Sequence, residues 1–306
     1  SYNLIYRKIS MKFIAFEYDG AQDIGILDSS TDKIAPLGNI LAKHIDNNTH
    51  DLVALIKYFS EITGILDNQK GILDFSKVKL KAPISNPPKN IMCVGKNYFE
   101  HAQEFTQSGF DATSKRGDNI PDHPIIFTKP ASAILASEEK IKSHKNLTKQ
   151  LDYEAELAVI IGKQGTGIKK ENAFDHVFGY TIINDITGRD LQLKHRQWFI
   201  GKSLDTSCPM GPWITSADEV DAENLNIKCW VNGELRQEAN TRDLIFDIPT
   251  LIETISSGIT LQPGDIISTG TPAGVGIGFD PPRFLSSGDT IRIEIEGLGH
   301  LINKVA

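Results

Sequence analysis

The chain has 306 residues, of which 40% are hydrophobic, enough to bury the core of one large domain or of two. Its formal net charge of −7 argues against a nucleic-acid-binding protein, because neutralising phosphates requires a basic face. The sequence contains no run of about 18 apolar residues that could span a membrane. It has three widely spaced cysteines and no visible signal peptide, which together favour a reducing cytoplasm.

The first 85 residues are predicted to form a small α+β domain. "FIAFEYDGAQDIGILDSS" predicts two strands joined at Asp19-Gly20, and "DLVALIKYFSEI" predicts a helix with one apolar face. The proline-bearing stretch 81–90 suits neither a helix nor a central strand, so we place a domain boundary after residue 85. The chain starts with Ser whereas Met11 resembles a natural start, so we expect residues 1–10 to be an upstream extension.

Residues 86–306 form the second predicted domain, in which short strand-like segments dominate. The Asn232-Gly233 pair in "VNGELR" is a strong hairpin signal, and helices are predicted around residues 96–105 and 245–258. Many strands, few helices and frequent Gly and Pro indicate an α+β, β-rich domain that closes as a barrel or roll.

Two carboxylates share one face of the strand predicted for "LDYEAELAVIIG", residues 151–162. Because side chains alternate along a strand, Glu154 and Glu156 point to the same side, about 7 Å apart. A third carboxylate, Asp185, ends the apolar strand "YTIIND". Oxygen ligands without convergent His or Cys favour Mg²⁺ or Mn²⁺ over Zn²⁺. The alternative is a set of surface acids, or of acids paired with Lys or Arg.

The segment "VGKNYFEHAQE" places His101 and Glu104 one helical turn apart. A carboxylate beside an imidazole orients the ring and raises its basicity, as a general base requires. The alternative interpretation is an ordinary ion pair on a helix surface, which is the commoner meaning of this spacing.

Two further segments carry candidate substrate contacts. Lys202 in "FIGKSLDTSCPMGP" would stabilise an enolate or pair with a substrate carboxylate, although most lysines are only solvated. "STGTPAGVGIG" resembles a dinucleotide fingerprint, but "FDPPRF" follows it in place of a helix, which excludes that hypothesis. Its backbone amides and the Thr271 hydroxyl would still suit a carboxylate.

Taken together, residues 88–300 resemble the fumarylacetoacetate hydrolase superfamily. The resemblance rests on "VGKNYFEHAQE", "IIFTKP", "DYEAELAVIIGK", "VFGYTIINDITGRDLQ", "GKSLDTSCPMGP", "VNGELRQ" and "GDIISTGTPAGVG", in the order of the family. It implies a β-roll catalytic domain, a homodimer, and Mg²⁺- or Mn²⁺-dependent chemistry on small 2-oxo acids or their enols, with no role for nucleic acid or membrane.

The resemblance also implies roles for individual residues. The metal ligands would be Glu154, Glu156 and Asp185, and the catalytic dyad would be His101 and Glu104, on a segment that orders as a lid when substrate binds. The remaining matches are substrate-contacting positions, among which Lys202 would act in catalysis: Lys129, Arg189, Gln192, Lys202 and Thr271. The chain departs from many relatives at Gly188, where Ala is common, and in a longer loop after the dyad.

The pattern as a whole most resembles bacterial two-domain members acting on oxaloacetate. It predicts decarboxylation or enol–keto tautomerisation of oxaloacetate. The alternatives are C–C hydrolysis of acylpyruvates such as fumarylpyruvate, isomerisation of 2-hydroxyhepta-2,4-diene-1,7-dioate, and a non-catalytic metal-binding protein. The His101–Glu104 pair favours C–C cleavage over a pure isomerase, because isomerisation needs no activated water.

Overall fold

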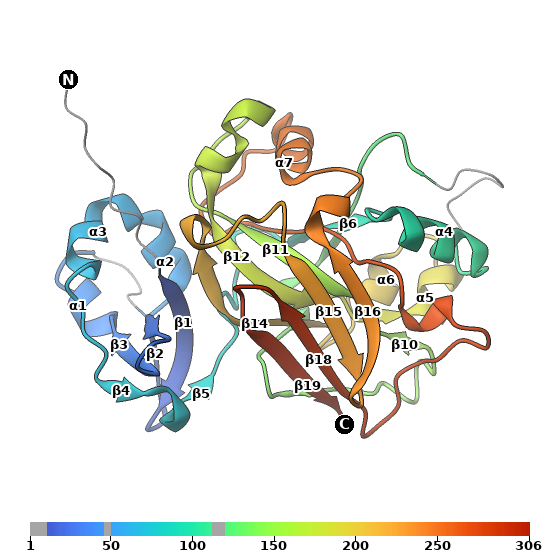
Figure 1. Ribbon diagram of the computed structural model, residues 1–306, viewed down its shortest axis with the longest axis horizontal. Helices are drawn as coiled ribbons and strands as arrows, with labels where there is room; N and C mark the ends of the chain where they lie inside the picture. The colour runs from blue at the N-terminus through green and yellow to red at the C-terminus, as the bar shows by residue number, and fades with distance from the viewer. Residues whose placement is uncertain (1–10, 46–49, 112–119) are drawn as a thin grey trace.

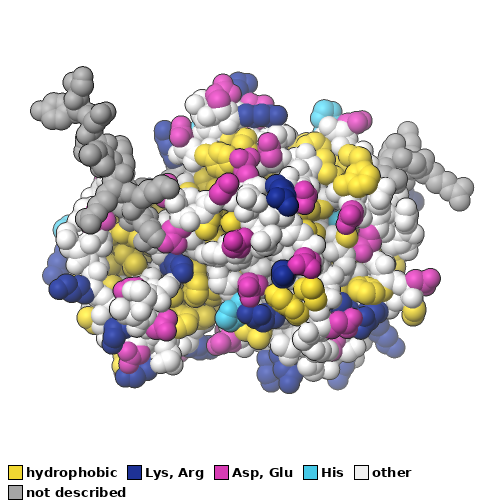
Figure 2. Space-filling view, viewed as in Figure 1, with side chains coloured by type: hydrophobic (Ala, Val, Ile, Leu, Met, Phe, Trp, Pro, Cys, Tyr) yellow, Lys and Arg dark blue, Asp and Glu magenta, His cyan; other side chains and the backbone are white. Residues whose placement is uncertain are grey.

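The computed structural model describes residues 11–45, 50–111 and 120–306 (Figure 1). The expected upstream extension, residues 1–10, and part of the long loop after the dyad lie outside these ranges. None of the helices in the described ranges is both long enough and apolar enough to cross a membrane. On the face seen in Figure 2, acidic and basic side chains are interspersed over most of the surface.

The N-terminal part is a strand-and-helix unit, as predicted. Asp19 and Gly20, both with positive φ, form the two-residue turn between β1 and β2, which confirms the expected hairpin. The helix expected over 51–62 is present as two shorter helices that meet at Tyr58, the first capped by Asp51. The elements are β1 (Lys12–Tyr18), β2 (Ala21–Asp28), β3 (Lys33–Pro36), α1 (Gly38–Leu41), α2 (Leu52–Lys57), α3 (Phe59–Leu66), β4 (Leu73–Asp74), η1 (Phe75–Lys77) and β5 (Lys79–Leu80).

The remainder of the chain is dominated by strands. Asn232 and Gly233, again with positive φ, connect β15 to β16 as the sequence predicts. The strands are β6 (Ile91–Gly95), β7 (Ile125–Lys129), β8 (Ile134–Leu135), β9 (Lys140–Ile141), β10 (Leu151–Asp152), β11 (Ala155–Ile161), β12 (Val177–Asn184), β13 (Thr187–Gly188), β14 (Cys208–Ser216), β15 (Asn226–Val231), β16 (Glu234–Asn240), β17 (Ile266–Ser268), β18 (Thr290–Ile295) and β19 (His300–Val305).

Helices are fewer and short. Both predicted helices of this part are confirmed, as α4 and α7. The helices are α4 (Phe99–Gln107), α5 (Arg189–Lys194), α6 (Phe199–Lys202) and α7 (Ile248–Ser256), with 3₁₀ turns η2 (Ala131–Ala133), η3 (Lys170–His176), η4 (Ala217–Glu219), η5 (Thr241–Asp243) and η6 (Gly276–Gly278).

Two open sheets form the body of the molecule. The larger has the strand order β4-β3-β2-β1-β14-β12-β11-β17-β6-β7, and the smaller has the order β16-β15-β18-β19-β9. Neither closes on itself within the described residues, so the β-rich α+β class is confirmed but a closed barrel is not formed. The two sheets lie against each other in Figure 1, and a core that includes Leu157, Ile227 and Ile293 fills the space between them.

The opposite face of the larger sheet packs against the helices of the N-terminal part. Ala158 and Ile160 of β11 belong to a core cluster with Leu52 and Leu55 of α2. Strand β11 is therefore buried on both faces, which explains its nearly continuous apolar sequence. The sheet itself runs across the expected boundary, because β1 pairs with β14. The division at residue 85 stays a prediction.

Candidate active site

The three predicted metal ligands lie together at one end of β11 and β12. Ala155 of β11 pairs with Asn184 of β12, which brings the flanking Glu154 and Asp185 side by side, and the Asp185 amide donates to the Glu154 carbonyl at 2.9 Å. One carboxylate oxygen each from Glu154, Glu156 and Asp185 lies within 4.8 Å of the others. All three side chains are buried, so the interpretation as surface acids is wrong.

Two of the three carboxylates have buried cationic partners. Lys202 Nζ lies 2.9 Å from Glu154 Oε2 and 2.8 Å from Asp185 Oδ2, and so bridges them. Arg189 Nη2 lies 2.8 Å from Glu154 Oε1. Burial alone would raise the pKa of Glu154, but Lys202 and Arg189 outweigh that effect and hold the pKa well below its usual range. Glu154 therefore stays ionised and able to bind a cation.

Glu156 differs from its two neighbours. Among the described residues it forms no ion pair, and its Oε2 accepts hydrogen bonds from the Ser268 hydroxyl and, at 3.1 Å, from the Gly270 amide. Burial, together with the negative charges of Asp185 and Glu154, raises its pKa well above the usual range. A buried, unpaired carboxylate in this cluster is costly, and a bound cation would offset that cost.

The donor set fits a hard divalent cation. All three candidate ligands are carboxylates, which Mg²⁺ and Mn²⁺ prefer, and no Cys or His side chain joins the cluster in the described residues. Lys202 pairs with Glu154 and Asp185 but not with Glu156. The pKa of Glu156 therefore stays raised, and a bound cation would supply the positive charge that this carboxylate lacks.

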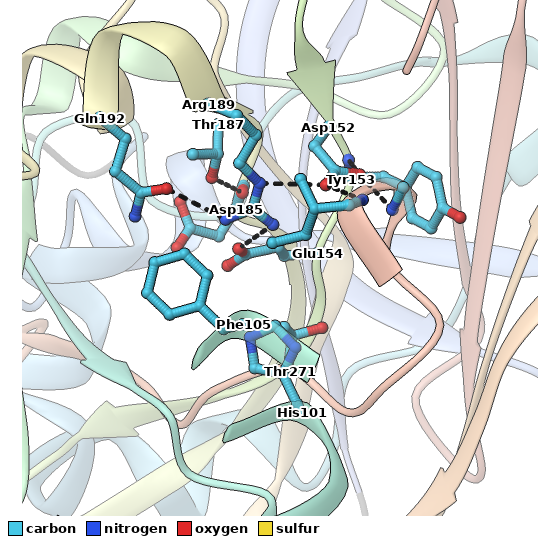
Figure 3. Close-up of polar contacts among 12 residues, drawn as sticks. His101, Phe105, Asp152, Tyr153, Glu154, Asp185, Thr187, Arg189, Gln192 and Thr271 are labelled. Atoms are coloured by element: carbon cyan, nitrogen blue, oxygen red, sulfur yellow. Dashed lines mark hydrogen bonds and ion pairs between the residues drawn. The ribbon is translucent and has the colours of Figure 1, made fainter. Parts of the chain in front are cut away.

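The predicted dyad faces the same site. His101 and Glu104 lie on α4, with Nδ1 of the ring 3.1 Å from Glu104 Oε2. The imidazole is 5% exposed, so the interpretation as a helix-surface ion pair is wrong. Because Glu104 engages Nδ1, the other ring nitrogen, Nε2, is left for chemistry in the site. Figure 3 shows the ring beside Thr271 and below Glu154.

A small cavity joins these groups. Six of the predicted residues line it: His101, Glu154, Arg189, Gln192, Lys202 and Thr271. Another part of its wall is formed by three aromatic side chains, Phe105, Phe127 and Trp198. Trp198 packs edge-to-face against the other two, with ring centres 5.7 Å from Phe105 and 5.4 Å from Phe127. The cavity thus combines cationic and hydrogen-bonding groups with an apolar wall.

Lys129 is the one predicted substrate-contacting residue that does not line this cavity. It is fully buried and donates to Asp185 Oδ1 at 2.7 Å and to the Ile186 carbonyl at 2.9 Å. Its position supports Asp185, and its predicted contact with substrate stays a prediction.

Two supporting residues were not singled out from the sequence. Asp152 Oδ2 accepts from Arg189 Nε at 3.0 Å, and Figure 3 shows this carboxylate on the side of Arg189 away from Gln192. Gln237 Nε2 donates to the Thr271 hydroxyl at 2.8 Å. Asp152 stands on the same predicted strand face as Glu154 and Glu156, a signal that could have indicated it; Gln237 had no such signal.

The model of the fumarylacetoacetate (FAA) hydrolase C-terminal domain matches residues 90–306. The chain belongs to this family. Its members are enzymes, and the chain is an enzyme of the fumarylacetoacetate hydrolase family. The match covers the smaller sheet, the strands of the larger sheet from β6 onward, and the dyad, the carboxylates and the cavity described above.

Three relatives illustrate the range of the family. Oxaloacetate tautomerase YisK from Bacillus subtilis is 56% identical over 231 residues, which are 75% of this chain and 74% of that protein. The fumarylacetoacetate hydrolase EaFAH from Exiguobacterium antarcticum is 42% identical with a TM-score of 0.82, over 97% of this chain and 99% of that one. Maleylpyruvate hydrolase from Sphingobium sp. SYK-6, solved with manganese(II) and pyruvate, is 32% identical with a TM-score of 0.75, over 97% and 99%.

Proposed function

We propose that the protein is an oxaloacetate enol–keto tautomerase that depends on Mg²⁺ or Mn²⁺. The observation that carries the substrate and the reaction is the 56% identity to a tautomerase of oxaloacetate. The cavity supports it, because the positive charges of Arg189 and Lys202 and the imidazole of His101 line one small space, which suits a small, anionic oxo acid.

The residues around the cavity divide into binding and proton-transfer groups. Arg189, with Gln192 and Thr271, would hold the carboxylate next to the 2-oxo group, and Lys202 would add positive charge near the oxygen on which the enolate charge develops. A divalent ion held by Glu154, Glu156 and Asp185 would supply Lewis acidity toward the same substrate oxygens.

His101 is the candidate carrier of the proton. With Nδ1 held by Glu104, its Nε2 would remove a proton from C3 of the keto acid, and the electron pair would form the C2–C3 double bond. The imidazolium would then give that proton to the 2-oxygen, which completes the enol and restores the neutral imidazole. From the sequence alone, activation of water was the favoured role of the dyad. The similarity to a tautomerase favours proton transfer instead, since one imidazole suffices to move a proton between carbon and oxygen.

Two related reactions remain alternatives. Decarboxylation would start from the same keto acid, but loss of CO₂ from C4 would leave the enolate of pyruvate, which takes up a proton at C3 to give pyruvate. C–C hydrolysis of an acylpyruvate is favoured by the 32% identity to maleylpyruvate hydrolase and would use His101 to activate water. The homodimer implied by the family resemblance also stays a prediction, which sedimentation equilibrium would test.

The decisive experiment uses metal-stripped protein reconstituted with Mg²⁺ or Mn²⁺, with Glu154→Ala as the control. Loss of enol absorbance and release of pyruvate are followed on oxaloacetate, acetylpyruvate and fumarylpyruvate, each against a blank of free metal. Metal-dependent enol loss without pyruvate supports the tautomerase, and pyruvate from oxaloacetate supports the decarboxylase. Cleavage confined to the acylpyruvates would overturn both.

A further inference from the structure

The carboxylate of Glu104 rests on the glycine-rich segment 274–278. Its Oε1 accepts a hydrogen bond from the Gly274 amide at 3.1 Å, while its Oε2 faces Nδ1 of His101 at 3.1 Å. The two oxygens therefore have separate partners, one that fixes the carboxylate on the segment and one that orients the imidazole.

Gly278 leaves the space that Glu104 occupies. A Cβ atom added at this position would overlap the Glu104 carboxylate and would lie 2.7 Å from its Cγ, and the three nearest heavy atoms all belong to Glu104. The φ of Gly278 is not positive, so the backbone there would accept an L-residue without strain. The need for glycine at 278 thus comes from Glu104, not from the backbone.

The segment is also held by Asp152. Asp152 Oδ1 accepts from the Gly276 amide at 2.7 Å, and Oδ2 accepts from the Ile277 amide at 3.1 Å. Oδ2 also receives Arg189 Nε, so one buried carboxylate fixes both the substrate-facing arginine and the segment beneath Glu104. Phe105 of α4 packs in the same apolar cluster as Val275 and Ile277, which anchors the helix to this segment.

We propose that residues 274–278 form a seat for Glu104 and that Gly278 is a positioning residue of the His101–Glu104 dyad. The proposal rests on the proposed function only in taking His101 as the group that moves the proton. With a side chain at 278, the flexible Glu104 would be pushed off the Gly274 amide and out of line with Nδ1. The imidazole would then lose the carboxylate that orients it.

A double-mutant cycle separates this role from ordinary packing. The variants are Gly278→Ala, Glu104→Ala and the pair together, with Gly258→Ala as a matched control, because that glycine also lacks a positive φ and nothing lies within 4 Å of an added Cβ. We expect Gly278→Ala to lower kcat at least about tenfold with little change in KM, as expected for a disturbed general base. In the Glu104→Ala background, Gly278→Ala should cause no further loss of kcat.

The same cycle read by thermal unfolding does not depend on the substrate. Gly278→Ala should lower Tm in the wild-type background and leave it unchanged or raised beside Glu104→Ala, because the new methyl group then fills vacated space. If the loss of Tm in the double variant equals the sum of the losses in the two single variants, the proposed seat for Glu104 is wrong, whichever substrate is turned over. Non-additive Tm changes without any turnover of oxaloacetate would uphold the seat and overturn the proposed function instead.

Discussion

The carboxylate of Asp152 receives the Nε–H of Arg189 at 3.0 Å inside the protein, and both side chains are at most 1% exposed. Asp152 is also surrounded by backbone donors: the amides of Tyr153, Gly276 and Ile277. All four contacts are donors, so the site requires a group that only accepts hydrogen bonds. Burial raises the pKa of Asp152, while Arg189 and the Gly276 amide act against that rise.

Asp152→Asn should therefore lower stability and weaken substrate binding, although the side chain keeps its shape. Whichever way the amide is oriented, its NH₂ group faces donors, and Arg189 loses a buried counter-charge, which costs about 3–5 kcal/mol in comparable pairs. We expect a lower free energy of unfolding by denaturant and a raised KM for oxaloacetate. Asp205→Asn, in an exposed pair with Lys142, is the control and should change neither. Equal effects of the two variants would contradict this account.

Lys202→Met removes the ammonium that bridges Glu154 and Asp185. Asp185 and Glu154 raise the pKa of Lys202 above its usual range despite burial, so the wild-type group is charged. In metal-free protein the variant should lose about 3–5 kcal/mol of stability. Mn²⁺ should raise its Tm by more than it raises that of the wild type, because the ion replaces the missing charge. A smaller rise than in the wild type would refute this, and Lys142→Met serves as the surface control.

Glu156→Gln should have the opposite effect on metal-free protein. The amide oxygen can still accept from Ser268 and Gly270, while the repulsion from Asp185 and Glu154 disappears. We expect a Tm equal to or above that of the wild type without metal. Calorimetric titration should show Mn²⁺ affinity reduced by at least the roughly 10–100-fold typical of disturbed metal sites. Unchanged affinity would exclude Glu156 as a ligand.

Local parts of the fold were predictable because their causes are local. The turns at Asp19-Gly20 and Asn232-Gly233 follow from residues that tolerate positive φ, and both hairpins are present. The grouping of Glu154 with Glu156 follows from the alternation of side chains along one strand. The position of Asp185 at the end of a second apolar strand suggested that it joins these acids, and the resemblance to a family then implied that all three are metal ligands.

The supporting contacts were not predictable, since they depend on how distant segments pack. Asp152 meets Gly276 across more than a hundred residues of sequence, and nothing near either residue indicates the other. The ion pair of Lys129 with Asp185 was not predicted either, because β7 and β12 are distant in sequence and three strands separate them in the sheet order. The need for glycine at position 278 is explained only by the packing of Glu104, on α4, against it.

His101→Ala tests which reaction uses the imidazole. If His101 carries the proton, enol–keto exchange of oxaloacetate should fall by about 10²–10⁴-fold. The rise in Tm on adding Mn²⁺ should be unchanged, since the carboxylate cluster remains intact. His300→Ala, exposed at the start of β19, is the control. Tautomerisation that persists while acylpyruvate cleavage disappears would instead assign His101 to the activation of water.

Trp198→Phe tests whether the aromatic wall limits the length of the substrate. Trp198 lines the cavity between Phe105 and Phe127, and it packs against Gly95 so closely that an added Cβ there would lie 2.8 Å or less from the indole ring. The smaller ring should leave space at that wall, at a stability cost of about 1–3 kcal/mol, below the cost of truncation to Ala. We expect kcat/KM for fumarylpyruvate to rise relative to oxaloacetate in a competition assay. Trp230→Phe, on the smaller sheet, should leave the ratio unchanged, and an unchanged ratio in Trp198→Phe would show that this wall does not set substrate length.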